Sequence, residues 1–286
     1  MKKIMAKWLF SSILLLSPIL SNAQENFNKN NLLAWCIIPY DSLNRGPEER
    51  VKMLKELDIQ HYVYDWRSEH ISTFEKEIKT AKQNNIKIEG IWLWIDESYD
   101  KIGLLSANNK QVIEIAKANN LNCDFWVGFN QNFFDNLSHK EKVNKGSDFL
   151  KYLSETLKPS KICLYNHGDW FGEPENQIEI IQKSKLKNVG LVYSFHHGHH
   201  QINRFPSMLK NMLPYLNAIN LNGMDIQKGQ ILSIGQGKHE KEMINTIIES
   251  GFSGKIGILG HIINKDVKEV LQENLHGLKI ILGKSL

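Results

Sequence analysis

Residues 161–197 read KICLYNHGDWFGEPENQIEIIQKSKLKNVGLVYSFHH, and this stretch contains the pattern that decides the fold. A short apolar run at 161–165 is followed by an amphipathic stretch at 174–184 that opens with proline, and then by a second apolar run at 189–195. Proline is favoured in the first turn of a helix, and short continuous apolar runs are typical of strands buried on both faces. The segment therefore predicts a strand, a helix and a second strand of a parallel sheet.

The same alternation extends along the rest of the chain. We predict eight strands, at residues 32–38, 61–65, 86–94, 123–129, 161–165, 189–195, 218–222 and 255–260. The helices that follow them are predicted at 47–57, 69–84, 110–118, 139–157, 174–184, 205–213, 240–250 and 266–275. The alternation predicts an α/β fold. Eight such units in about 260 residues match a single (β/α)8 TIM barrel, whose usual size is about 250 residues.

A doubly wound open sheet is the alternative fold. Its dinucleotide-binding form would carry a Gly-x-Gly-x-x-Gly fingerprint between the first strand and the first helix. That junction reads PYDSLNRGPEER instead, at residues 39–50. The barrel is therefore the preferred prediction.

The first 23 residues have the composition of a secretory signal peptide. Three lysines precede an apolar run at 8–20, and small residues follow it at 21–23. The run is short for a membrane span, so a retained anchor is the less favoured alternative. We expect an exported protein, periplasmic or secreted, with a barrel domain at residues 24–286 and no stable membrane insertion. Removing the three lysines lowers the formal charge from +4 to +1, which argues against a nucleic-acid partner.

Three cysteines, Cys36, Cys123 and Cys163, each lie within an apolar strand-like run. A buried free cysteine behaves as a small hydrophobic side chain. We expect all three to pack in this way, although exported proteins can also form disulfides.

Polar and aromatic residues follow most of the predicted strands. In (β/α)8 barrels the C-terminal ends of the strands form one face, which carries the active site. Aromatic rings stack on sugars, while amides, carboxylates and imidazoles bond sugar hydroxyls, so this face predicts a pocket for a small-molecule sugar. The expected substrate-binding residues are Arg67, Trp92, Trp94, Tyr165, Asn166, Trp170, His196 and Asn222.

Individual aromatic residues have a second interpretation. Trp92 and Trp94 share one face of a predicted strand, where burial in the core is as well supported as a place in the pocket. Trp35 and Trp126 are expected to pack in the core or under the helices.

Histidines supply the expected acid and base. His167 stands beside a glycine at a strand end, and imidazole gains or loses a proton near neutral pH. His196 and His197 are adjacent, so we expect only one of them to face the barrel axis, and His197 joins His167 as the expected acid or base. Asp65 or Glu173 would orient these groups or share the proton transfer. A structural role for His167, and a metal-binding role for the run 196–200, are the alternatives.

Three motifs carry a resemblance: LYNHGDWFGEPENQIEII at 164–181, VGLVYSFHHGHHQI at 189–202 and PYLNAINLNGM at 214–224. They resemble the xylose isomerase-like barrel superfamily, in particular an exported branch described as sugar phosphate isomerase/epimerase-like. The resemblance implies a divalent metal at the barrel mouth and proton shifts next to a carbonyl that the metal polarises.

The metal ligands that the resemblance implies are largely replaced in this chain. The family pattern has Glu, Asp, His and Glu after strands five to eight, and these positions fall on Tyr165, Ser194, Asn220 or Asn222, and Leu259 or Gly260. Neutral phenol, hydroxyl and amide groups make a poor cage for a divalent cation. An ion such as manganese, zinc or cobalt would instead have His167, His197 and His261 as ligands.

Three functions follow from these observations. The preferred one is an exported isomerase, epimerase or lyase that acts on a free or oxidised sugar by proton transfer next to a carbonyl. The sugar is expected to lack phosphate, because Arg67 is the only basic residue in evidence at the rim. The alternative is a non-catalytic sugar-binding barrel that has lost the metal site. Superfamily kinship alone suggests a nucleic-acid repair enzyme, which the charge of +1 disfavours.

Overall fold

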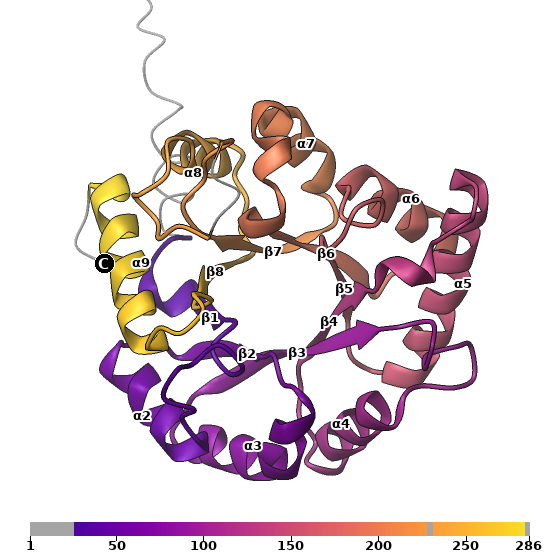
Figure 1. Ribbon diagram of the computed structural model, residues 1–286, viewed down its shortest axis with the longest axis horizontal. Coiled ribbons are helices and arrows are strands. Elements are labelled where there is room, and N and C mark those ends of the chain that lie inside the picture. Colours follow the sequence, from indigo (N-terminus) through magenta and orange to yellow (C-terminus); the bar gives the residue numbers. More distant parts are fainter. Residues whose placement is uncertain (1–25, 228–230, 284–286) are drawn as a thin grey trace, which may run out of the picture.

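The computed structural model describes residues 26–227 and 231–283, and the predicted signal peptide at residues 1–23 lies outside them. Eight parallel strands close into a barrel in the order β1 to β8, and β8 pairs with β1 (Figure 1). Helices lie around the outside of this ring of strands. The predicted (β/α)8 barrel is confirmed, and the open sheet is wrong because the β1–β8 pairing leaves no free edge.

The strands lie close to their predicted positions. Their bounds are β1 Leu32–Trp35, β2 His61–Tyr64, β3 Lys87–Ile95, β4 Asp124–Phe129, β5 Ile162–Tyr165, β6 Val189–Ser194, β7 Leu216–Leu221 and β8 Lys255–Leu259. The largest difference is in β1, which ends three residues earlier than predicted. Cys36 has a φ of 56°, a left-handed conformation that turns the chain out of the strand.

The helices confirm the alternation, with shifts at their ends. They are α2 Pro47–Glu56, α3 Phe74–Gln83, α4 Ala107–Ala118, α5 His139–Leu157, α6 Pro174–Ser184, α7 Phe205–Met212, α8 Glu240–Glu249 and α9 Val267–Leu282. The predicted start of α3 is instead a separate 3-10 helix, Ser68–Thr73. Within the described residues, no helix combines the length and the apolar character that crossing a membrane requires.

The inside of the barrel is filled by large aromatic side chains. A cluster of buried residues draws at least one member from every strand, and Trp35, Trp92, Trp126 and Tyr165 are its largest members. The ring of Trp35 lies 4.9 Å from that of Trp126, 5.7 Å from that of Trp92 and 5.4 Å from that of Tyr165, measured between centroids. We call these four residues the aromatic floor. The prediction that Trp35 and Trp126 are buried is confirmed.

Two glycines make room for the aromatic floor. A Cβ atom at Gly128 on β4 would collide with the ring of Trp92, and one at Gly90 on β3 would lie 3.1 Å from the indole nitrogen of Trp126. The large rings and the missing side chains on neighbouring strands therefore complement one another, as dense interior packing requires.

The cysteines are free, as predicted. Cys123 and Cys163 are buried in the cores outside and inside the barrel, respectively. Cys36 departs from the expectation, because it is only half-buried and lies at the top of the barrel after the end of β1. Its thiol therefore belongs to the surface of a cavity rather than to strand packing.

The aromatic floor gives a stability prediction. Gly128→Ala should lower the free energy of unfolding by about 1–3 kcal/mol, because the added methyl group forces Trp92 out of its place. Gly46→Ala is the control, since its methyl group would meet nothing closer than 3.8 Å and should cost less than about 1 kcal/mol. Urea unfolding followed by tryptophan fluorescence measures both, and equal losses would contradict tight packing at Gly128.

Candidate functional site

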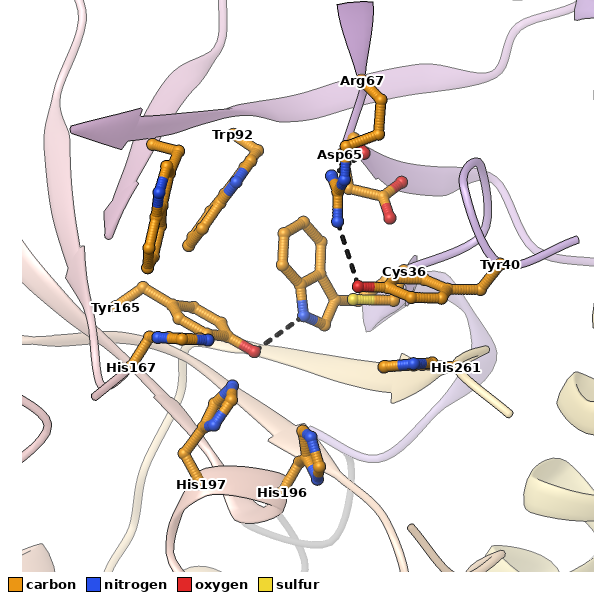
Figure 2. A pocket seen from close by; sticks show the side chains of 12 residues that line it. Cys36, Tyr40, Asp65, Arg67, Trp92, Tyr165, His167, His196, His197 and His261 are labelled. Atoms are coloured by element: carbon orange, nitrogen blue, oxygen red, sulfur yellow. Dashed lines mark hydrogen bonds between the residues drawn. The ribbon is translucent and has the colours of Figure 1, made fainter. Parts of the chain in front are cut away.

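A cavity of about 340 Å³ opens above the aromatic floor, at the C-terminal ends of the strands (Figure 2). This is the face where the sequence predicted a pocket. The residues that line it come from the ends of β1, β2, β3, β5, β6 and β8: Trp35, Cys36, Tyr40, Asp65, Arg67, Trp92, Trp94, Tyr165, His167, His196, His197 and His261.

Asp65, directly after β2, is the acidic group of the cavity. Its side chain is 2% exposed, and neither carboxylate oxygen accepts a hydrogen bond of normal geometry. Burial raises the pKa of Asp65 to about 6, although the nearby Arg67 guanidinium acts in the opposite direction. A buried carboxylate with a raised pKa is a stronger base than an ordinary aspartate.

Arg67 is held in place by its own chain. Its guanidinium donates hydrogen bonds to the backbone carbonyl oxygens of Asp65 at 3.0 Å and Trp66 at 2.8 Å, and to the Tyr40 hydroxyl at 3.0 Å (Figure 2). The Tyr40 ring in turn stacks on the His261 ring, with centroids 3.4 Å apart. These contacts join the loops after β1, β2 and β8 into one wall of the cavity.

Four histidines line the cavity together. The centroids of the His167 and His197 rings lie 4.5 Å apart, as do those of His196 and His197, while His196 and His261 are 5.8 Å apart. Burial lowers the pKa values of all four, to about 4 for His196 and His261. The imidazoles are therefore neutral at neutral pH, and each offers one N–H donor and one acceptor nitrogen.

The adjacent His196 and His197 both line the cavity, contrary to the expectation that only one would face inwards. The expectation assumed a strand, in which neighbouring side chains point to opposite faces. Residues Phe195–His197 form a 3-10 helix instead, which presents both rings on the same side.

Trp92 and Trp94 on β3 both contribute to the cavity and lie 5.9 Å apart between ring centroids. Trp92 is also part of the aromatic floor, so both interpretations of this residue hold at once. Trp94 is half-buried and meets the His167 ring edge to face at 4.8 Å. An aromatic surface beside imidazoles and a carboxylate suits the apolar and polar faces of a sugar.

Four expected site residues lie outside this cavity because they have other partners. Glu173 pairs with Arg204 and with His200, whose Nε2 lies 2.8 Å from the carboxylate. Asn166 accepts a hydrogen bond from the Ser194 backbone nitrogen and donates one to its carbonyl oxygen, which ties β5 to β6. Asn222 donates to the Gly223 carbonyl oxygen, and Trp170 lines a neighbouring smaller cavity.

Cys36, Tyr40 and Trp35 line the cavity although sequence reasoning did not select them. Tyr40 had a usable signal, since it is the first aromatic residue after the first strand. Cys36 had no such signal, because nothing in the apolar run predicts the left-handed turn that brings it to the cavity.

The metal cage implied by the resemblance does not fit the donors present here. Tyr165 accepts a hydrogen bond of 2.9 Å from the Trp35 indole, and the side chains of Ser194 and Asn220 lie against the same hydroxyl. Burial holds the pKa of Tyr165 well above its usual value, so the phenol stays neutral. At the β8 position stands Leu259, which packs into the cluster inside the barrel.

These neutral and apolar groups replace the carboxylates that a hard divalent cation prefers. Nor do His167, His197 and His261 complete a site, since no group of three or more His, Cys, Asp or Glu among the described residues is arranged to hold a metal.

Comparisons with known proteins support the fold. No known protein family and no curated protein matches the sequence. Among solved structures, the IolI protein with a bound zinc atom has a TM-score of 0.67 at 12% identity, covering 88% of this chain and 98% of that one. The 3-keto-D-glucoside 4-epimerase YcjR from E. coli has a TM-score of 0.67 at 14% identity, covering 88% and 100%.

A third structure, a xylose isomerase-like TIM barrel protein from Mycobacterium smegmatis in complex with magnesium, has a TM-score of 0.53 at 13% identity, covering 86% of this chain and 91% of that one. At such identities the likeness concerns the fold and not the activity. The chain therefore shares the (β/α)8 barrel fold of these structures, as its motifs predicted.

Proposed function

We propose that this chain is a carbohydrate-active enzyme, an isomerase, epimerase or lyase, that moves a proton next to the carbonyl of an unphosphorylated sugar. The observation that carries the proposal is the placement of two kinds of proton carrier around one cavity. Asp65 follows β2, and His197 follows β6, four strands away around the ring. Figure 2 shows the carboxylate and the imidazole on opposite sides of the open space.

This arrangement suits the chemistry of a carbon next to a carbonyl. With a pKa of about 6, Asp65 is mostly ionised at neutral pH and is basic enough to accept a proton. His197 and His167 are neutral, because burial lowers their pKa values, so each can pass on its N–H proton while its other ring nitrogen accepts one from water or the neighbouring ring. Removal of a proton from one face and its return from the other inverts a stereocentre. Removal followed by loss of a neighbouring group makes a double bond, which is the lyase outcome.

The electrostatics of the cavity favour a sugar without phosphate. Arg67 is the one Lys or Arg side chain among the twelve lining residues, and it is already bonded to Tyr40 and to two carbonyl oxygens. A phosphate dianion would therefore meet neutral imidazoles and the Asp65 carboxylate. The fold neighbour YcjR, by its name, acts on an uncharged keto-glucoside, which supports a ligand of this class.

A second function is favoured by the neutral donors at the expected metal positions. If Tyr165, Ser194 and Asn220 mark a loss of catalysis, the barrel would bind a sugar without changing it. The exchange experiment below separates the two functions. We also propose that the protein is exported, on the support of the signal-peptide pattern at residues 1–23.

The first prediction concerns proton exchange. In D2O, the protein should place deuterium next to the carbonyl of methyl 3-keto-D-glucoside or D-fructose, as followed by NMR. Asp65→Asn and His197→Gln should each slow this exchange by about 100-fold or more, the usual contribution of a general acid or base. His200→Gln, on the same loop as His197 but outside the cavity, is the matched control and should keep the wild-type rate.

Binding of the sugar without any exchange would establish the sugar-binding alternative. Full exchange in both the Asp65 and the His197 variants would remove these residues from the mechanism.

The second prediction concerns pH. The exchange rate should rise as the pH increases through about 6, because the ionised Asp65 is the base, and Asp65→Asn should abolish this inflection. A rate that does not change between pH 5 and 8 would exclude Asp65 as the base.

The same carboxyl group gives a prediction about stability. Its folded pKa of about 6 lies above the value of about 3.9 in an unfolded chain, so the neutral form stabilises the fold, and that stability is lost as the pH rises from about 4 to about 6. Asp65→Asn cannot ionise. Its free energy of unfolding relative to wild type should therefore increase by on the order of 1–3 kcal/mol between pH 4 and pH 8, as measured by urea unfolding. A difference that is the same at both pH values would show that Asp65 is not destabilised by burial.

A further inference from the structure

A second, smaller cavity of about 110 Å³ adjoins the first. It lies between the loop after β4, the loop after β5 and the first turns of α5. Its polar and aromatic lining includes Asn130, Gln131, Lys142, His167, Asp169 and Trp170. None of these residues except His167 contributes to the main cavity.

His167 is the point where the two cavities meet, since it lines both. On the side of the main cavity its ring contacts Trp94 and His197. Its Nδ1 atom is buried and has no hydrogen-bond partner among the described residues. Gly168 then turns the chain with a φ of 89°, and this turn brings Asp169 and Trp170 to the second cavity.

The second cavity is lined by three charged side chains, of which the two carboxylates are exposed. Within the described part of the chain, Lys142, Asp135 and Asp169 form no ion pair, although all three line the same small space. The ammonium group of Lys142 lies 5.4 Å from the centre of the Trp170 ring. That ring is held by a hydrogen bond of 3.3 Å from its nitrogen to His139 and by contact with Phe134. Carboxylates and an ammonium beside a fixed aromatic ring are groups that bind sugar hydroxyls.

From these observations we infer that the second cavity is a subsite for a second sugar unit, so that the substrate class is a disaccharide or a longer saccharide rather than a single sugar. The inference rests on the proposed function of the main cavity. The sugar that reacts lies in the main cavity, the attached sugar lies against Trp170 and Lys142, and the bond that joins them passes His167. An anionic group would face two carboxylates and one ammonium here, and an apolar group would bury all three charges, so a neutral polyhydroxylated unit fits best.

The experiment compares two probes that differ only by the second unit. Methyl 3-keto-D-glucoside supplies the first sugar alone, and 3-ketocellobiose supplies the same keto sugar joined to a glucose. Calorimetric titration of the full protein should give a dissociation constant at least about tenfold lower for 3-ketocellobiose. Lys142→Met and Trp170→Ala should each reduce this preference to about threefold or less. Tyr99→Ala, which removes an exposed ring from the loop after β3, is the control and should keep the preference.

The outcomes separate the inference from the proposed function. Equal affinities of the wild-type protein for the two probes would overturn the subsite, and so would an undiminished preference for 3-ketocellobiose in both variants. In either case, deuterium exchange at the keto sugar would still support the proposed enzyme. Failure of both probes to bind or exchange would overturn the proposed function and the subsite with it. Should Trp170→Ala disturb folding, Lys142→Met decides the question, because Lys142 is a half-buried side chain of α5 whose ammonium lies 5.4 Å from the centre of the ring.

Discussion

The contact of Trp35 with the rings of Trp92, Trp126 and Tyr165 is the interaction on which the rest of the structure depends. The four rings fill the inside of the barrel, and the cavity lies directly above them. The Trp35 indole also donates to the Tyr165 hydroxyl, which orients the last residue of β5 just before Asn166 and His167. Trp35 and Tyr165 thus contribute packing energy and also help to position His167, a candidate acid.

Burial above this floor determines the charge of the cavity. The same loss of solvent raises the pKa of Asp65 and lowers those of the four histidines, so burial favours the uncharged form of the carboxyl group and of the imidazoles. A cavity of this kind offers little to a strongly charged molecule. The uncharged aromatic floor and the Asp65 and histidine side chains above it therefore form one site.

The fold could be predicted from the sequence because alternating short apolar and amphipathic runs are a local signal, repeated eight times. The face that carries the cavity followed from that fold, since strand ends meet at one side of a barrel. Details that depend on backbone turns or distant partners could not be predicted in this way. Cys36 reaches the cavity through a left-handed residue, His196 and His197 share a 3-10 helix, and Glu173 is bound by Arg204 from a later loop.

The hydrogen bond between Trp35 and Tyr165 has a consequence for the evolutionary routes open to this barrel. A carboxylate at position 165 would replace a ring that packs against three tryptophans, and it would place a negative charge inside a buried aromatic cluster. The Asn220 side chain likewise occupies the space above Gly257, where β8 has no side chain. Substitutions at positions 35 and 165, and at positions 220 and 257, are therefore expected to be non-additive. Acidic metal ligands at these positions would require coordinated changes on several strands, because single substitutions would each disturb the packing described here.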